Sequence, residues 1–478
     1  MNEYFSGSTG YSWADALANI SIQKSAFSIT TTYDVDPSTM DDGDALKKES
    51  LQEEVVMLTE REEEATYWKD SPKLRATSTV EQYTTKDKIG RGNFYTAGGS
   101  PELTEQEYKR HFEQVKFFGI VGRIDGPTLE MSKAGGMLRE VLGELKESNT
   151  IELIKSLDYA IREADSDMVA SEFDGEVKQH REKCRFPTQS IIDLKGSVLI
   201  PKNINDATEI IASIGHFTGA LNAYTGTKNM TNMVNNLIQN QRYIINGQDL
   251  QQNQMLSSFR TNQTQNGTYK TDIFMNPESF VNGMLNLDIG TEIVGATSDK
   301  APVITGGSFA ITTPANTSGY DLEAGSFKYL LILQNAFGTS AAIETATVNV
   351  SSGQKVVFTE SGFSSFVTGQ EATCVQIWRR RTDSTTKQDY RLVTRATWAG
   401  AKEDTGQYIP GTSKMVIKPT DAKQVFAVHQ LLNAMFEPLA KVDDSVRLLH
   451  KIYLTPILKN ANREVWIINI GDNPVDLG

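Results

Sequence analysis

The chain has 478 residues, 39% of them hydrophobic, which is enough to bury large cores and predicts roughly two to four domains. It carries 60 acidic and 47 basic residues, which gives a formal net charge of −13. This charge disfavours a nucleic-acid-binding function based on phosphate contacts, although it does not exclude a local basic patch. The two cysteines, Cys184 and Cys374, lie far apart and predict isolated thiols rather than a disulfide framework, so secretion is not expected. The sequence has no signal-peptide pattern and no apolar run long enough to span a bilayer.

The N-terminal part combines a polar segment with one predicted helix. Residues 1–45 are rich in Ser, Thr, Gly and Asp and carry few apolar anchors, so they should order only against another surface. From Ala45 to Trp68 the apolar residues follow helical spacing within an acidic excess, which is typical of a solvated helix face. Ser71-Pro72 should end this helix, because the residue before a proline disfavours helical geometry.

The following segment predicts an extended β-hairpin. A β-prone strand runs from Thr79 to Ile89, a glycine-rich tip covers Gly90–Gly99, and a second β-rich run extends from Phe112 to Ile124. Gly126-Pro127 should stop the second strand. The hairpin is too long to be covered by a helix of its own subunit, so we expect it to meet another surface.

A long amphipathic helix should follow the hairpin directly. From Leu129 onward the apolar residues fall at helical spacing, namely Leu138, Val141, Leu142, Leu145, Ile151, Ile154, Leu157, Ile161 and Ala164. At about 1.5 Å per residue, a single helix over this stretch would span roughly 50 Å. Long helices that lie across a sheet are common in ordinary domains. The hairpin before this helix favours a subunit that contacts other subunits, because the helix cannot cover the whole hairpin.

The part that follows the long helix, from Cys184 to Val281, predicts a mixed α and β region. Ser197–Ile200 is a short strand candidate, and Asn205 or Asp206 should cap a helix whose apolar residues are Ile210, Ile211, Ile214 and Phe217. The run Asp272–Val281 predicts a buried strand, a turn at Asn276-Pro277 and the start of a helix.

Residues 300–411 predict a small β-sandwich, because helical periodicity disappears and short strand candidates recur between turn signals. The strand candidates are Lys328–Leu333, Ala346–Val350, Lys355–Thr359, Cys374–Trp378 and Tyr390–Val393, with turns at Asn335–Gly338 and Ser351–Gly353. The segment from Ala324 to Ser340, together with Ile377–Arg379, resembles fibronectin type III or immunoglobulin-like modules. The mixed pattern resumes after Thr412, so the sandwich should be an insertion.

The C-terminal part should return to the first domain. Apolar residues around Val425–Leu432 precede two strand candidates, Val446–Leu454 and Glu464–Ile470, separated by Lys459–Arg463. Both strands are expected to pair with the sheet that carries the long helix.

The sequence contains no catalytic spacing. Gly90-Arg91-Gly92 and Gly98-Gly99 lack the ending of a phosphate-binding loop, and no nucleophile-elbow motif occurs. The histidines lack the spacing of a zinc helix and have no cysteine partner at ligand spacing, and they are His111, His180, His216, His429 and His450.

Three local groups admit a structural interpretation beside a functional one. His216 and His429 fall in apolar surroundings and predict satisfied core histidines. Asp443-Asp444 predicts a turn or a solvated pair rather than a cation site, and Arg379–Arg381 predicts a solvated basic edge rather than a phosphate contact. No catalytic, cofactor-binding or metal-binding residue and no cofactor are therefore predicted, and the chain is not expected to be an enzyme.

The order of several motifs resembles the major capsid protein of tailed bacteriophages with the Hong Kong 97-type fold. The motifs are Ser78–Tyr83, the glycine-rich tip, Val115–Gly119, the long helix with Leu157–Arg162, the strand around Phe274–Pro277, and Pro438–Val442 leading to Ile467–Asn469. The insertion is similar to immunoglobulin-like modules in capsid proteins of some large contractile-tailed phages, and Gln407–Thr412 would mark the return to the capsid core.

The resemblance implies an α+β fold with an N-terminal arm, an extended loop, a peripheral domain with a spine helix, an axial domain and an inserted all-β sandwich. The implied boundaries are 1–78 for the arm with its acidic helix, 79–126 for the extended hairpin loop, 127–201 for the peripheral domain, 202–299 for the axial domain, 300–411 for the insertion, 412–445 for the axial continuation and 446–478 for the peripheral continuation.

The resemblance also implies a function. Copies of the chain would form hexamers and pentamers of an icosahedral head shell that encloses double-stranded DNA without sequence-specific binding. Such a shell is assembled in the host bacterial cytoplasm, with portal, scaffold or decoration proteins as further partners and no membrane. Some relatives cross-link neighbouring subunits through Lys and Asn side chains, and Lys86 and Lys88 lie on the corresponding loop. Some relatives also lose an N-terminal segment to a protease.

Two other classes stay open from the sequence. One is the shell of a cargo-holding nanocompartment, which the insertion and the chain length disfavour. The other is a host- or glycan-binding protein whose β-sandwich is the working part.

Overall fold

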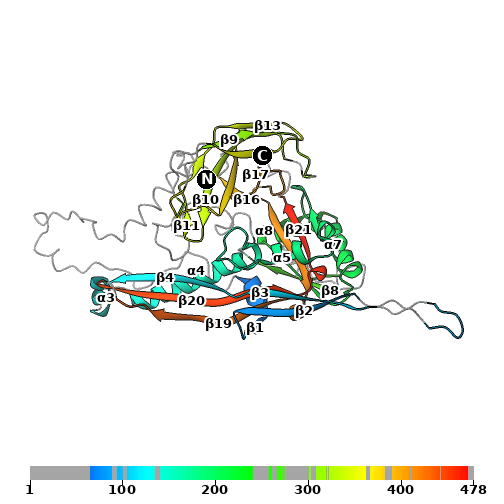
Figure 1. Ribbon diagram of the computed structural model, residues 1–478, viewed down its shortest axis with the longest axis horizontal. Helices are drawn as coiled ribbons and strands as arrows, with labels where there is room; N and C mark the ends of the chain where they lie inside the picture. Colours follow the sequence, from blue (N-terminus) through cyan, green and yellow to red (C-terminus); the bar gives the residue numbers. More distant parts are fainter. Residues whose placement is uncertain are drawn as a thin grey trace, which may run out of the picture. The chain divides into compact units, whose positions relative to one another are not determined.

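The computed structural model describes residues 65–88, 94–100, 105–134, 140–240, 258–260, 266–272, 275, 301–302, 308–318, 320, 322–361, 366–382, 390–409, 412–441 and 443–471. Helices and strands are mixed along this part of the chain, which confirms the α+β class (Figure 1). The predicted segment 1–45, most of the helix to Trp68, and the turn and helix after Asn276 lie outside the described residues. The described end of that first helix is α2 (Thr66–Asp70), which stops at Ser71 as expected.

A four-stranded sheet supports the longest helix of the described chain. Its order is β1 (Lys73–Arg75), β19 (Phe426–Pro438), β20 (Ser445–Leu458) and β4 (Lys116–Asp125). One face packs against α4 (Val141–Glu163), whose buried Leu153, Leu157 and Ile161 share a core with this sheet. The contact is close enough that a Cβ on Gly122 would lie 2.8 Å from the side chain of Leu145.

The predicted single helix from Leu129 is wrong, because the chain forms α3 (Gly126–Lys133) and then α4. Helix α3 ends before Ala134, and the sequence continues with Gly135-Gly136, two residues of low helix propensity. With 23 residues, α4 extends about 35 Å. The stop of the preceding strand at Gly126-Pro127 is confirmed.

The hairpin forms, but its second strand is shorter than predicted. Strand β2 (Val80–Lys88) pairs antiparallel with β3 (Glu107–Gln114). Val115 is buried and its N–H donates to the carbonyl of Thr79 at 2.9 Å, which closes the hairpin. The rest of the predicted strand is β4, which pairs with β20 in the four-stranded sheet.

A six-stranded sheet accompanies the four-stranded one, and these two sheets with their helices are called the body here. Its order is β5 (Ile191–Asp193), β21 (Val465–Ile470), β18 (Ser413–Pro419), β6 (Leu221–Thr225), β8 (Asn266–Thr271) and β7 (Ser258–Arg260). Helices α7 (Pro201–Ser213) and α8 (Thr227–Asn240) pack on it through a core that includes Ile211 and Met233. Two short helices, α5 (Glu176–Lys183) and α6 (Pro187–Ser190), and two 3₁₀ turns, Ala422–Gln424 and Ala461–Arg463, complete the body.

The two C-terminal strands lie in different sheets, contrary to prediction. Strand β20 pairs with β4 and β19, whereas β21 pairs with β18 and β5. Every residue of β21 is buried, because Trp466 and Ile468 face one core and Val465 and Ile467 face the other. The chain passes from the six-stranded to the four-stranded sheet between β18 and β19, and it passes back between β20 and β21. Neither change falls at residue 445.

Three local predictions in the middle of the chain are also wrong. Ser197–Ile200 is irregular, and the neighbouring strand is β5. Helix α7 begins at Pro201 rather than after Asn205 or Asp206, because proline lacks an N–H and its fixed φ suits a first helical position. Asp272 follows β8 and does not start a strand.

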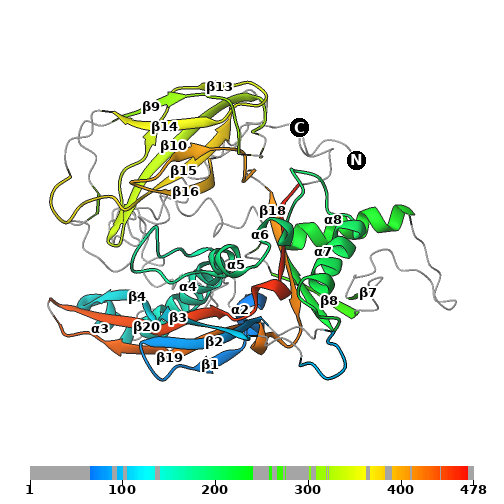
Figure 2. The same cartoon turned by 45° about the vertical axis from the view of Figure 1, so that its right-hand side comes forward.

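Two further sheets lie between Ser308 and Asp404 (Figure 2). The larger contains β11 (Gly338–Thr339), β10 (Gly325–Asn335), β15 (Cys374–Arg381) and β16 (Arg391–Thr397), with β12 (Ile343–Glu344) and β13 (Val348–Val350) also on β10. The smaller contains β17 (Lys402–Asp404), β14 (Val356–Ser361) and β9 (Ser308–Thr312). The rings of Tyr329 and Phe358 meet between the sheets at 5.0 Å. Each strand predicted in this region overlaps an observed one.

Candidate assembly surface

The base of the β2–β3 hairpin is fixed to the body by its inner face. The Tyr83 ring stacks on His111 with centroids 5.1 Å apart, and its hydroxyl donates to the carbonyl of Leu458 at 3.1 Å. Lys183 lies 2.6 Å from the carboxylate of Glu113. Burial raises the pKa of Tyr83 above its ordinary value of 10.0. These contacts attach the base of the hairpin to the rest of the subunit.

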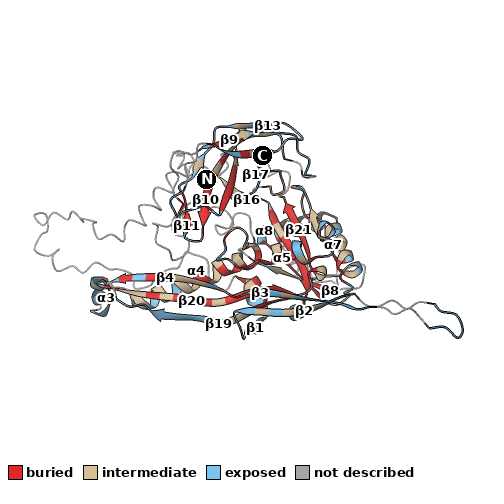
Figure 3. Ribbon diagram, in the orientation of Figure 1, coloured by how far each residue is buried: buried red, intermediate tan, exposed pale blue. Residues whose placement is uncertain are grey.

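The opposite face of the hairpin, here called the outer arm face, carries the exposed side chains of Val80, Tyr108 and Phe112. The described residues of β2 and β3 are exposed or intermediate and none is buried (Figure 3). Because side chains alternate along a strand, the fixed inner residues leave these apolar ones pointing to solvent. Tyr108 is 59% exposed and Phe112 is 68% exposed. In the described part of the tip, Phe94 and Tyr95 are also exposed. An isolated two-stranded hairpin of this kind is only marginally stable in water without a partner surface.

A second exposed apolar area, here called the sheet face (Phe117, Val121, Met435 and Tyr453), lies on the four-stranded sheet opposite α4. Phe117 is 66% exposed and packs edge-on against Tyr453, with centroids 4.6 Å apart. Met435 lies on the same face as Phe117. It pairs with Lys451, which in turn pairs with Gly119, and Gly119 shares the face of Phe117 because it lies two residues further along β4. Among the described strands, β4 pairs only with β20, so its outer edge offers unpaired backbone groups.

These two surfaces have the properties of subunit contacts. Monomeric proteins rarely leave apolar areas and open strand edges side by side, because both promote association. The outer arm face and the sheet face are different surfaces, so a contact between them would be heterologous. Heterologous contacts build closed rings when the rotation closes.

Sequence comparison gives relatives over nearly the whole chain. The chain is similar to phage major capsid proteins. It is 23% identical over 443 residues to the major capsid protein of Staphylococcus phage S25-3, covering 88% of this chain and 89% of that protein. The major capsid protein of Staphylococcus phage K gives the same identity and coverage. No protein-family model matches the sequence.

Structure comparison gives neighbours at low similarity. Microbacterium phage Oxtober96 has a TM-score of 0.46 at 8% identity, covering 90% of this chain and 98% of that chain. The capsid of a native GTA particle has a TM-score of 0.43 at 6% identity, with 91% and 98% covered. The holo-SrpI encapsulin complex from Synechococcus elongatus has a TM-score of 0.40 at 6% identity, with 90% and 96% covered. At these scores the similarity does not by itself identify the fold.

The histidines do not form a metal site in the described part of the chain, where no group of three or more candidate ligands converges. His216 is exposed at a positive φ of 47°, so its predicted core position is wrong. His429 is largely buried, 3.4 Å from Glu81, but its ring nitrogens lack a hydrogen bond, so it is not satisfied as predicted. Burial lowers the pKa of His429.

No helix of the described residues is both long and apolar enough to cross a membrane.

The predicted basic edge at Arg379–Arg381 is wrong for its first residue. Arg379 is 3% exposed and forms an ion pair with Asp404 at 2.7 Å. This ion pair could not be predicted from the sequence, because Asp404 lies 25 residues away on another strand. Arg380 lies 3.7 Å from Glu344, and Arg381 pairs with Glu323.

Two smaller predictions agree with the structure. Asp443 is exposed and accepts from Arg447 at 2.9 Å, as a solvated turn residue should. Cys184 and Cys374 are buried free thiols.

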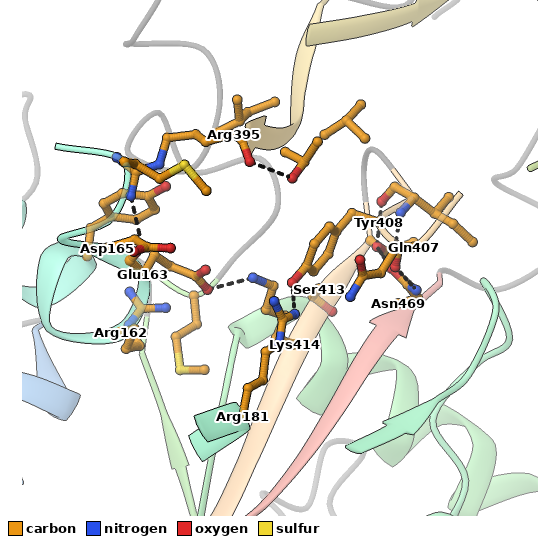
Figure 4. Close-up of a pocket in the computed structure, with 18 residues that line it drawn as sticks. Arg162, Glu163, Asp165, Arg181, Arg395, Gln407, Tyr408, Ser413, Lys414 and Asn469 are labelled. Atoms are coloured by element: carbon orange, nitrogen blue, oxygen red, sulfur yellow. Dashed lines mark hydrogen bonds and ion pairs between the residues drawn. The ribbon is translucent and has the colours of Figure 1, made fainter. Parts of the chain in front are cut away.

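A polar cavity of about 230 Å³ lies where β16 approaches the end of α4 (Figure 4). The Arg395 guanidinium contacts both carboxylate oxygens of Glu172 at 3.0 and 3.1 Å, and it donates to the carbonyl of Glu163 at 3.1 Å. Lys414 lies 2.5 Å from the Glu163 carboxylate (Figure 4). Burial would raise the pKa of Glu163, but the Lys414 ammonium outweighs it and the pKa is lowered. These contacts connect strand β16 to α4 and to Glu172, and nothing in the sequence spacing predicted them.

Proposed function

We infer that this protein is the major capsid protein of a tailed bacteriophage, a structural subunit that assembles with its own copies into the virion shell. The observation that carries this inference is the similarity to phage major capsid proteins over 443 residues, which spans 88% of the chain. A match of that extent concerns the whole subunit rather than one shared module. The exposed outer arm face and sheet face support it, because a shell subunit needs such surfaces. The role is structural rather than enzymatic.

We propose the Hong Kong 97-type fold for the body. The four-stranded sheet with α4 would be the peripheral domain, and the six-stranded sheet with α7 and α8 the axial domain. The extended loop would then be the hairpin from 79 to 115 rather than to 126. The axial domain would comprise residues 202–299 together with two later strands, β18 and β21. The predicted N-terminal arm, residues 1–78, would lose its last part to the peripheral domain, because α2 and β1 belong to the core and the sheet that this domain shares with α4.

We further propose that residues 300–411 are an inserted immunoglobulin-like domain. Two sheets over one shared core support this, as does the return of the chain at β18, which pairs with β6 and β21 of the body. The ion pair between Arg395 and Glu172 would fix the orientation of this domain. Decoration of the outer shell surface suits a domain attached in this way.

In the assembled shell, the outer arm face of one subunit would lie on the sheet face of a neighbour. Repeated contacts of this kind would build the hexamers and pentamers of an icosahedral head around double-stranded DNA. The net charge of −13 suits a wall that does not bind phosphate strongly. Assembly in the host cytoplasm, scaffold, portal and decoration partners, and N-terminal cleavage remain predictions. Lys86 is exposed beside Tyr108, which makes it reachable for a cross-link.

Negative-stain imaging of the purified full-length chain tests the function. Capsomer rings or closed shells that hold no host protein are expected. A strictly monomeric sample under all assembly conditions would refute the inference. Shells that enclose a specific enzyme would favour the nanocompartment alternative, and a monomer that binds glycans through residues 300–411 would favour the host-binding one.

A further inference from the structure

A cluster of buried charged side chains joins the two sheets of the body. Lys418 comes from β18, Glu176 and His180 from α5, and Glu464 immediately precedes β21. Each of these four side chains is at most 2% exposed. Charged groups are rarely buried to this degree unless they are paired, so each needs an account of its partner.

Lys418 supplies one positive charge to the cluster. Its ammonium donates to the Tyr67 hydroxyl at 2.7 Å and to a Glu176 oxygen at 3.2 Å. It lies over the rings of Tyr67 at 4.1 Å and Phe426 at 4.4 Å. Aromatic faces stabilise a desolvated cation.

Two carboxyl groups meet this single ammonium. Glu464 accepts a hydrogen bond from the indole N–H of Trp466 through one oxygen. The second oxygen of Glu464 and the second oxygen of Glu176 are both buried without a hydrogen-bond partner. The two side chains lie close enough to interact, so a proton carried by one carboxyl group can be donated to the other.

Other ionisable groups near the cluster do not supply that proton. His180 shares its Nε2 with Ser190 at 2.9 Å, and its Nδ1 lies 3.7 Å from Glu464; burial, with help from Arg181, lowers the pKa of His180 to about 4. The remaining groups that face the cluster are Tyr67 of α2, Asp158 and Arg162 of α4, Arg181 of α5, Tyr224 of β6 and Asp272 after β8. Of these, Arg162 is neutralised by Asp158 at 2.8 Å, and Asp272 accepts the Tyr67 N–H at 2.8 Å.

We propose that Glu176 and Glu464 share one proton, taken up when the subunit folds, and that this proton is a structural component of the joint between the two sheets. Without it, two carboxylates would face one ammonium in a site closed to water. With it, the cluster is neutral, and Lys418 keeps the Tyr67 hydroxyl, and with it the segment before the hairpin, in place. The proposal concerns the isolated subunit and does not depend on the assembly function.

The shared proton makes subunit stability depend on pH with a defined sign. Burial, reinforced by the charge of Glu176, raises the pKa of Glu464 well above its ordinary value of 4.5. The stabilisation from the proton is therefore fully present below pH 4.5 and is lost as the pH rises from there through the raised value. Across that window the unfolding equilibrium constant should rise about tenfold per pH unit.

The test compares Glu464→Gln with the full-length wild-type chain in chemical unfolding from acid to alkaline pH. Glutamine keeps an acceptor for Trp466 and offers an N–H to Glu176, so it mimics the protonated acid. The ratio of the two unfolding constants should change by about tenfold per pH unit, whatever its starting value. A Glu209→Gln variant, at an exposed position of α7, is the matched control and should leave the ratio constant.

Infrared spectroscopy gives an independent readout. The wild-type subunit should show the carbonyl stretch of a protonated carboxylic acid that persists above the pH at which ordinary carboxyl groups ionise, and Glu464→Gln should remove this band whereas Glu209→Gln retains it. A pH-independent ratio, or an absent carboxylic-acid band, would overturn the proposal. If Glu464→Gln does not fold, the wild-type band and its loss in Glu176→Gln decide the question.

Discussion

Replacing Phe112 by alanine tests the assembly role of the outer arm face. Phe112 is 68% exposed in the subunit, on β3, and its partner across the hairpin is Gln82 on the same face. If a neighbouring subunit covers this ring, the loss should affect assembly. The fold of the subunit itself should hardly change, because exposed substitutions usually alter stability by less than about 0.5 kcal/mol.

The expected magnitude follows from the exposed area. A phenylalanine side chain buries about 150–250 Å² when fully covered, so the exposed share of Phe112 is about 100–170 Å². At about 25 cal/mol per Å² this corresponds to about 2.5–4 kcal/mol per contact. Alanine retains part of that area, so Phe112→Ala should cost about 2–3 kcal/mol, or roughly 30–150-fold in the affinity of each contact.

Light scattering and negative-stain imaging against protein concentration measure this effect. Phe112→Ala should need a much higher concentration than wild type to form rings or shells, while its circular dichroism melting curve as a free subunit stays the same. Gln82→Ala is the matched control, because it lies opposite on the same face and removes little apolar area. Equal assembly of Phe112→Ala and wild type would refute the idea that a neighbour covers the outer arm face.

Further predictions concern side chains on strands β15 and β17. Asp404→Ala should lower the unfolding free energy by about 3–5 kcal/mol in urea titration, because it leaves the Arg379 guanidinium buried without its partner. Glu403→Ala, on the same strand but partly exposed, should cost less than about 1 kcal/mol, and similar losses for both variants would contradict this account. Burial raises the pKa of Cys374 to about 12, so iodoacetamide should alkylate it only on unfolding. Rapid labelling of the native chain, measured by mass spectrometry, would show that this thiol is accessible.

The sequence by itself was sufficient for element type wherever a local pattern repeats. The β-rich runs between 328 and 393 became strands, and the apolar stripe ending at Ile161 became α4, because burial of one face imposes the same period on any such segment. The hairpin was predictable for the same reason.

Sheet membership and charge pairing came from contacts between distant parts of the chain. The division of one β-rich run into β3 and β4 depends on Val115, whose burial only the packed body makes favourable. Strands β20 and β21 follow each other in sequence yet join different sheets, because β21 lies between two cores. Lys418 and Glu176 are separated by 242 residues, so their pairing leaves no local pattern. Periodicity records which side of an element is buried, but the partner that covers it is chosen by the packing of the whole chain.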